Sequence, residues 1–240
     1  MQFDFNIKNG LALLVDPDEG NVGTWSALAE RIQKSTIDVV LVGGSFLYRQ
    51  NLHACLTALQ SAKKPLIIFP GSNAQIDSAA DGILLLSLIS GRNPDLLIGQ
   101  HVQSAISLKM SGLSIYPTGY VLIDGGKPTT VSYISNTQPI PKDKPGLAAA
   151  TALAGEQLGM KIIYLDAGSG ADESVSAEMI QQTKALISVP IIVGGGIKST
   201  ESIQTAWNAG ANIVVIGNHA FEHSKFMEQL LAIKKQTIFN

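Results

Sequence analysis

Short apolar runs rich in valine, isoleucine and leucine recur along the 240 residues and alternate with amphipathic stretches. Such runs, when bounded by Gly, Pro or Asp, are typical of strands that are buried on both faces of a parallel sheet. Eight of them predict strands, at residues 11–15, 39–44, 66–71, 82–86, 119–123, 161–165, 190–193 and 213–216.

Apolar residues at helical spacing predict helices between most of these strands. They fall at residues 24–32, 52–59, 96–110, 147–158, 177–186, 203–207 and 226–233. Only ten residues separate the third strand from the fourth, which is short for a crossover helix, so that unit is expected to lack its helix. The connection at 124–144 has the length of a functional loop, and we expect a short strand within it at 129–134.

Strands that alternate with helices indicate an α/β protein with a parallel sheet, and eight such units close into a (β/α)8 TIM barrel. No linker or change in composition divides the chain, so residues 1–240 are expected to form one barrel domain, modified where the third helix is replaced by a short stretch. An open doubly wound sheet is the alternative, but no GxGxxG motif follows the first strand.

The composition narrows the possible partners and compartment. A formal net charge of −2 gives no electrostatic case for nucleic-acid binding. The one cysteine, Cys55, lies on an apolar helical face, where we expect a core thiol, and it fits a reducing cytoplasm. The longest apolar run, 82–89, is far shorter than the roughly 20 residues that span a bilayer, although a lipid substrate can still bring the protein to a membrane surface. The apolar composition of such a soluble barrel favours a homo-oligomer.

A carboxylate followed by glycines stands at the end of the sixth predicted strand. The residues there are Tyr164, Leu165, Asp166, Ala167, Gly168, Ser169 and Gly170. Glycines permit positive φ and close approach, so successive N–H groups can point at one anion. An acid beside such a nest suggests a ligand that carries both hydroxyls and a phosphate. The alternative interpretation is a tight strand-to-helix turn.

The next two strands also end in glycines, at Gly194, Gly195 and Gly196 and at Gly217 with Asn218. In (β/α)8 barrels the active site lies at the carboxyl ends of the strands, and phosphate often binds after strands seven and eight. The exposed amides of these loops also lie next to helix N-termini, whose dipoles favour an anion. The three loops together therefore predict a phosphate site.

Asp16 follows the first strand and Ser45 follows the second. Carboxylate and hydroxyl oxygens suit Mg²⁺, which takes few protein ligands and completes its shell with substrate phosphates. We therefore expect a Mg²⁺ site shared with a diphosphate. The alternatives are an Asx turn at Asp16 and a helix N-cap at Ser45.

These motifs, in this order and spacing, resemble the geranylgeranylglyceryl phosphate synthase family, which includes bacterial heptaprenylglyceryl phosphate synthases. The matching segments are residues 14–18, 42–45, 117–120, 164–170, 193–197 and 217–218. The resemblance implies a Mg²⁺-dependent prenyltransferase, in which the 3-hydroxyl of sn-glycerol 1-phosphate attacks C1 of an all-trans polyprenyl diphosphate such as geranylgeranyl diphosphate. An ether lipid precursor forms and diphosphate leaves.

By matching position, the resemblance implies metal ligands at Asp16 and Ser45. It implies a glycerol phosphate site made of residues 164–170 with Gly195, Gly196, Gly217 and Asn218. Asp166 is the expected catalytic residue, which orients the hydroxyl or takes its proton. Tyr120 is a candidate for lining the prenyl groove, and the alternative for it is the barrel core. The family often has Glu at the position of Asp166 and Lys at that of Glu19.

Two other functions use the same phosphate loops. One is an isomerase, epimerase or lyase that acts on a phosphorylated sugar, which would need an acid–base pair inside the barrel. The other is a non-catalytic binder of a phosphorylated metabolite, which would need neither Asp16 nor a metal.

Overall fold

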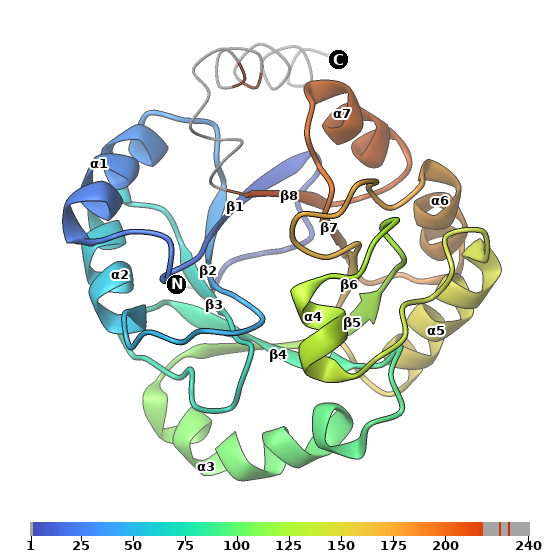
Figure 1. The fold of residues 1–240 in the computed structure, drawn as a ribbon, viewed down its shortest axis with the longest axis horizontal. Coiled ribbons are helices and arrows are strands. Elements are labelled where there is room, and N and C mark those ends of the chain that lie inside the picture. The colour runs from blue at the N-terminus through green and yellow to red at the C-terminus, as the bar shows by residue number, and fades with distance from the viewer. Residues whose placement is uncertain (1, 218–225, 227–229, 231–240) are drawn as a thin grey trace.

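The structure is a computed structural model that describes residues 2–217 together with Phe226 and Leu230. Eight parallel strands close into a barrel in which each strand pairs with the next along the chain and β8 pairs with β1 (Figure 1). They are β1 (Gly10–Val15), β2 (Val39–Gly43), β3 (Leu66–Phe69), β4 (Gly82–Leu88), β5 (Ser114–Leu122), β6 (Ile162–Asp166), β7 (Ile191–Gly194) and β8 (Ile213–Gly217). The predicted (β/α)8 fold is confirmed.

Helices surround the barrel, except that α4 lies inside the ring formed by the others (Figure 1). The α-helices are α1 (Val22–Gln33), α2 (Leu52–Leu59), α3 (Gln100–Ser111), α4 (Thr130–Ser135), α5 (Pro145–Gln157), α6 (Ala177–Leu186) and α7 (Thr200–Asn208). A 3-10 turn, η1 (Gln60–Ala62), extends α2, and a π-helical turn, η2 (Asp95–Gly99), precedes α3. No helix among the described residues is long and apolar enough to cross a membrane. The helix expected at 226–233 lies outside the described residues, apart from Phe226 and Leu230.

Two expectations for the segments around β5 were wrong. Residues 130–135 form a helix rather than a strand, because the Ser132 hydroxyl and the Thr129 backbone exchange hydrogen bonds that cap its start. The fifth strand begins at Ser114 rather than at Gly119. Pro117 has no amide proton to donate, and it lies in the part of β5, residues 114–117, whose strand partners are on β4 alone, because the register with β6 begins at Thr118.

Alternate residues of the strands divide the core into two layers. The outer layer lies between strands and helices, and it includes Cys55, whose thiol is buried and has its pKa raised to about 12. The inner layer fills the barrel. At its amino end the N-terminal segment contributes Phe5, which packs edge-on against Tyr116 with ring centroids 4.8 Å apart. That end is therefore occupied, and the carboxyl ends of the strands are left to form a site.

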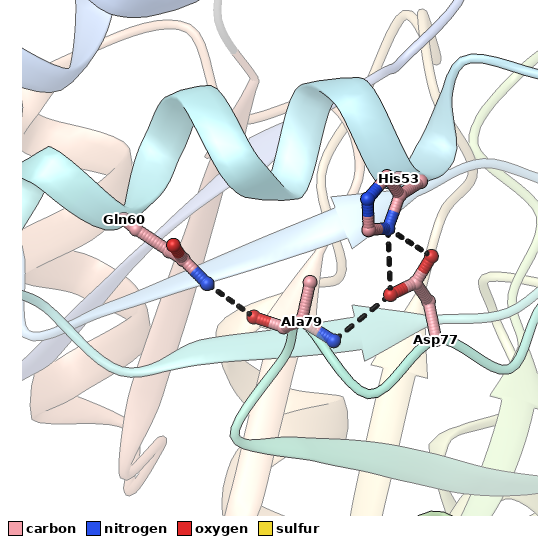
Figure 2. A network of polar contacts seen from close by, with 4 residues as sticks. All are labelled: His53, Gln60, Asp77 and Ala79. Carbon is pink, nitrogen blue, oxygen red and sulfur yellow. Dashed lines mark hydrogen bonds and ion pairs between the residues drawn. The ribbon is translucent and has the colours of Figure 1, made fainter.

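The connection from β3 to β4 has no helix, as the short spacing predicted, and α2 and η1 hold it instead (Figure 2). His53 Nδ1 lies 3.0 Å from Asp77 Oδ2, and Asp77 Oδ1 accepts a hydrogen bond from the Ala79 amide at 2.8 Å. The Gln60 side-chain amide donates to the Ala79 carbonyl at 3.2 Å. These bonds fix a segment that would otherwise lack the packing of a helix.

Asp77→Ala should lower the free energy of unfolding by about 1 kcal/mol, because the Ala79 amide loses its acceptor. His53→Ala is the matched control: its side chain is 74% exposed, so the loss should stay below about 0.5 kcal/mol. Urea unfolding measures both values. Equal losses would show that the His53–Asp77 contact, and not the Asp77–Ala79 hydrogen bond, holds the segment.

Candidate active site

Asp166 is a buried carboxylate at the end of β6. It shares its strand face with Tyr164, which belongs to the inner core, and it is 7% exposed. Its Oδ2 accepts a hydrogen bond from the Tyr120 hydroxyl, and its Oδ1 accepts one from the Gly168 amide at 2.7 Å. The sequence could not show the contact with Tyr120, because it depends on the register of β5 against β6, where Tyr120 pairs with Tyr164.

Burial raises the pKa of both partners of the Tyr120–Asp166 hydrogen bond. Desolvation raises the pKa of Asp166, while the hydrogen bonds from Tyr120 and Gly168 lower it by a smaller amount. Desolvation and the nearby Asp166 charge raise the pKa of Tyr120 well above its usual value. The tyrosine therefore keeps its proton and donates. Asp166 is left as a fixed carboxylate with more proton affinity than a carboxylate in water, which suits a general base.

Tyr120, the hydrogen-bond donor to Asp166, belongs to a cluster of three aromatic rings. Ring centroids are 5.5 Å apart between Tyr120 and Tyr164, 5.3 Å between Phe69 and Tyr164, and 6.1 Å between Phe69 and Tyr120. Tyr164 is fully buried, so its side chain belongs to the floor of the site. Leu165 points the other way, into the outer core, and only its backbone lies near the site.

The glycine loops after β6 and β7 pack directly against each other. A Cβ on Gly195 would lie 2.5 Å from the Gly168 nitrogen and 2.7 Å from Asp166 Oδ1, and a Cβ on Gly194 would lie 2.3 Å from the Tyr164 hydroxyl. Gly168, Gly170, Gly195 and Gly196 all have positive φ. These glycines therefore form tight turns, as one of the two interpretations expected, and they bring the two backbones close together.

The amides of the two loops do not all remain available for an anion. The Gly168 amide donates to Asp166, and the amide of the buried Ala167 donates to the Gly194 carbonyl. Within the described part of the chain, the amides of Ser169, Gly170, Gly195 and Gly196 make no hydrogen bond. Ser169, Gly170 and Gly217 are exposed at the mouth. Asn218 lies outside the described residues.

Asp16 lies at the end of β1, against the loop that carries Ser45. Its Oδ1 accepts a hydrogen bond from the Asp18 amide at 2.8 Å, and its Oδ2 is 3.0 Å from the position of a Cβ on Gly44. Desolvation and the neighbouring Glu19 and Asp18 raise the pKa of Asp16. A cation would relieve this repulsion, so the residues present fit Mg²⁺. They supply few ligands, since no group of three His, Cys, Asp or Glu side chains among the described residues is arranged to hold a metal.

Asp18 is a positioning residue that the sequence analysis missed. It is 8% exposed, and its carboxylate accepts hydrogen bonds from the amides of Tyr48 at 2.8 Å and Arg49 at 3.2 Å. It thereby fastens the loop after β2 to the loop after β1. The Asp-Pro-Asp motif is the signal in the sequence, but the backbone partners of its second acid lie about thirty residues away.

A cavity of about 170 Å³ extends from the loops after β2 and β3, along β4 and β5, to α4. Its wall is mostly apolar and consists of Ser45, Phe69, Pro70, Gly71, Leu86, Leu88, Leu96, Gln100, Tyr120, Val131, Ile134 and Ser135. The candidate metal ligand Ser45 and the aromatic pair Phe69 and Tyr120 thus face the same space. Tyr120 joins this cavity to Asp166.

Gly195→Ala should lower the free energy of unfolding by about 2 kcal/mol or more, through positive-φ strain and contact with Gly168. Gly217→Ala is the control, because a Cβ there meets no described atom within 4 Å and φ is not positive, so its effect should stay within about 0.5 kcal/mol. Urea unfolding compares the two. Similar values would show that the β6 and β7 loops are not in close contact.

Asp166→Asn should be more stable than the wild type at neutral pH. Since folding raises the pKa of Asp166, ionisation costs the native state stability as the pH rises through that pKa, and asparagine does not ionise. The difference should vanish as the pH falls toward about 4. Thermal unfolding between acid and neutral pH measures it. A variant less stable than the wild type at neutral pH would mean that the two hydrogen bonds outweigh burial.

Three comparisons with known proteins bear on this site. Residues 6–237 match the model of the PcrB family. A geranylgeranylglyceryl phosphate synthase from Spirosoma linguale is 48% identical over 230 residues, which cover 95% of this chain and 92% of the relative. A crystal structure of (S)-3-O-geranylgeranylglyceryl phosphate synthase from Thermoplasma acidophilum, in complex with its substrate sn-glycerol-1-phosphate, has a TM-score of 0.86 at 30% identity and covers 94% of this chain and 91% of that one.

A more distant likeness concerns the fold alone. An N-acetylmannosamine-6-phosphate 2-epimerase from Clostridium perfringens has a TM-score of 0.57 at 12% identity, covering 97% of this chain and 94% of that one. The family match, in contrast, runs almost the length of the chain and agrees with a relative that is nearly half identical. The resemblance inferred from the motifs is confirmed: the chain belongs to the PcrB family.

Proposed function

We propose that this protein is a prenyltransferase that joins geranylgeranyl diphosphate, or another all-trans polyprenyl diphosphate, to the 3-hydroxyl of sn-glycerol 1-phosphate. The observation that carries the proposal is the apolar cavity that meets a buried carboxylate through Tyr120, in a chain of this family. The names of the relative from Spirosoma and of the structure from Thermoplasma support the two substrates.

The acceptor would bind at the glycine loops. The amides of Ser169, Gly170, Gly195 and Gly196 are the candidate donors to its phosphate, with Gly217 and Asn218 as further members from the β8 end. Asp166 would then accept hydrogen bonds from the glycerol hydroxyls. Each of its oxygens already accepts one hydrogen bond and keeps a second acceptor position, so the carboxylate can orient the nucleophile and accept its proton.

The donor would place its diphosphate near Asp16 and Ser45 and its chain in the apolar cavity. Mg²⁺, when bound by these two residues, would neutralise the leaving diphosphate. Asp18 holds the two loops together, so it would position Ser45 without touching the substrate. The apolar wall between β4 and α4 excludes water from the reacting carbon, which protects it from hydrolysis.

The other features of the proposal come from the sequence. The homo-oligomer, the cytoplasmic location and the peripheral contact with a membrane surface stay predictions. An isomerase, epimerase or lyase acting on a phosphorylated sugar has less support, because Asp166 is hydrogen-bonded, among the described residues, to a tyrosine hydroxyl and a backbone amide rather than to a second acid–base group. A non-catalytic binder of a phosphorylated metabolite would need neither Asp16 nor the apolar cavity.

Incubation with radiolabelled glycerol 1-phosphate, geranylgeranyl diphosphate and Mg²⁺ tests the proposal. A product that extracts into organic solvent is the expected result. Radiolabel that stays in the aqueous phase as an isomer, or unchanged in every condition, would contradict it.

Asp16→Asn should reduce this turnover by about a hundredfold or more, because the carboxylate charge that recruits the cation is lost. Affinity for glycerol 1-phosphate, measured by calorimetry, should stay within about twofold, since the glycine loops are untouched. Glu30→Gln, on the exposed face of α1, is the charge-matched control and should behave as the wild type. Unchanged turnover in Asp16→Asn would remove the metal assignment. Mg²⁺ with inorganic diphosphate should raise the melting temperature of the wild type and not that of the variant.

A further inference from the structure

Phe69 belongs both to the inner core and to the wall of the apolar cavity. It is the last residue of β3, it belongs to the inner core, and its side chain is 7% exposed where it reaches the cavity wall. The aromatic rings in that wall are Phe69 and Tyr120, and the rest of the wall is aliphatic or polar. Both rings pack against Tyr164, within 5.5 Å between centroids.

Phe69 shares the cavity wall with Ser45, where the donor diphosphate is proposed to bind, and with Tyr120, which contacts Asp166. Ser45, which lines the same cavity, comes from the loop after β2 that lies against Asp16. Tyr120, the other ring, donates its hydroxyl proton to Asp166 in a hydrogen bond. A donor with its diphosphate at Ser45 and its reacting carbon directed at Asp166 would therefore carry that carbon past Phe69.

The backbone around Phe69 is held in place. A Cβ on Gly43 would lie 2.0 Å from the Phe69 carbonyl oxygen, and a Cβ on Gly71 would lie 2.3 Å from the Gly44 carbonyl oxygen. Strands β2 and β3 thus approach as closely as glycine allows. A ring on such a support keeps one orientation with little loss of entropy.

Resting on the proposed prenyl transfer, we propose that Phe69 stabilises the positive charge that develops on the allylic carbons of the donor. As the bond from C1 to the diphosphate oxygen breaks, its electron pair leaves with the diphosphate, and the positive charge is shared by C1 and C3. The glycerol hydroxyl oxygen then bonds to C1, and its proton passes to Asp166. The negative face of an aromatic ring attracts the intermediate charge without supplying a nucleophile that would capture it.

The strength of this attraction sets the size of the expected effect. A desolvated cation–π contact contributes about 2 kcal/mol, which corresponds to about thirtyfold in rate. It acts on the charged state alone, so it should change the rate of the chemical step and leave donor affinity almost unaltered.

The test replaces Phe69 by mono-, di- and trifluorinated phenylalanine, which keep the shape of the ring while weakening its negative face. Single-turnover rates with geranylgeranyl diphosphate should fall stepwise with each fluorine, by at least about tenfold over the series. The dissociation constant of the donor should stay within about threefold. Phe69→Leu should show the same separation of rate from affinity.

Leu88→Ile is the matched control, because Leu88 lines the same cavity with the same 7% exposure but presents no ring. It should change donor affinity more than the single-turnover rate. Rates that do not depend on fluorination, in a protein whose wild type forms the lipid product, would overturn the role of Phe69 and leave the proposed function intact. Failure of the wild type to form that product would overturn both.

Discussion

The buried carboxylate of Asp166 sets conditions that the rest of the barrel mouth has to meet. A carboxylate taken out of water is costly unless hydrogen bonds replace its hydration. Tyr120 and the Gly168 amide provide two such bonds. Gly195 has to lack a side chain, because a Cβ would collide with both Asp166 and Gly168. Gly194 has to lack one because its Cβ would collide with the Tyr164 hydroxyl. The glycine-containing segments after β6 and β7 are thus needed for packing, whatever they bind.

On the opposite side of the mouth, side-chain hydrogen bonds hold the loops together. There the loops after β1 and β2 are tied together by Asp18, and the connection after β3 is tied to α2 by His53 and Asp77. The missing helix between β3 and β4 leaves the cavity wall to Pro70 and Gly71 and to the turn before α3. A barrel with a complete set of helices would fill more of this side. The shortened unit therefore forms part of the cavity wall.

The strands and the approximate place of the site could be predicted from the sequence, because buried parallel strands are continuous apolar runs and their carboxyl ends meet at one face. The contact of Tyr120 with Asp166 could not, since a shift of one residue between β5 and β6 would separate them. The helix at α4 was missed because its stability comes from side-chain caps at Thr129 and Ser132 and not from apolar periodicity. Asp18 was missed because its partners, the amides of Tyr48 and Arg49, carry no signal in their side chains.

Asp16 and Asp166, the two acids at the mouth, are both at least partly buried but have different proposed roles. Burial raises the pKa of both Asp16 and Asp166, but their surroundings differ. Asp166 receives hydrogen bonds from a tyrosine and an amide, and the charges nearest to Asp16 are the carboxylates of Asp18 and Glu19. A cation relieves the repulsion between like charges. A carboxylate that is held by neutral donors has no such repulsion to relieve, and its raised pKa suits it to accept a proton during the reaction. In the proposed reaction, the like charges around Asp16 would therefore favour a cation on one side of the cavity, and the neutral donors around Asp166 would favour proton transfer on the other.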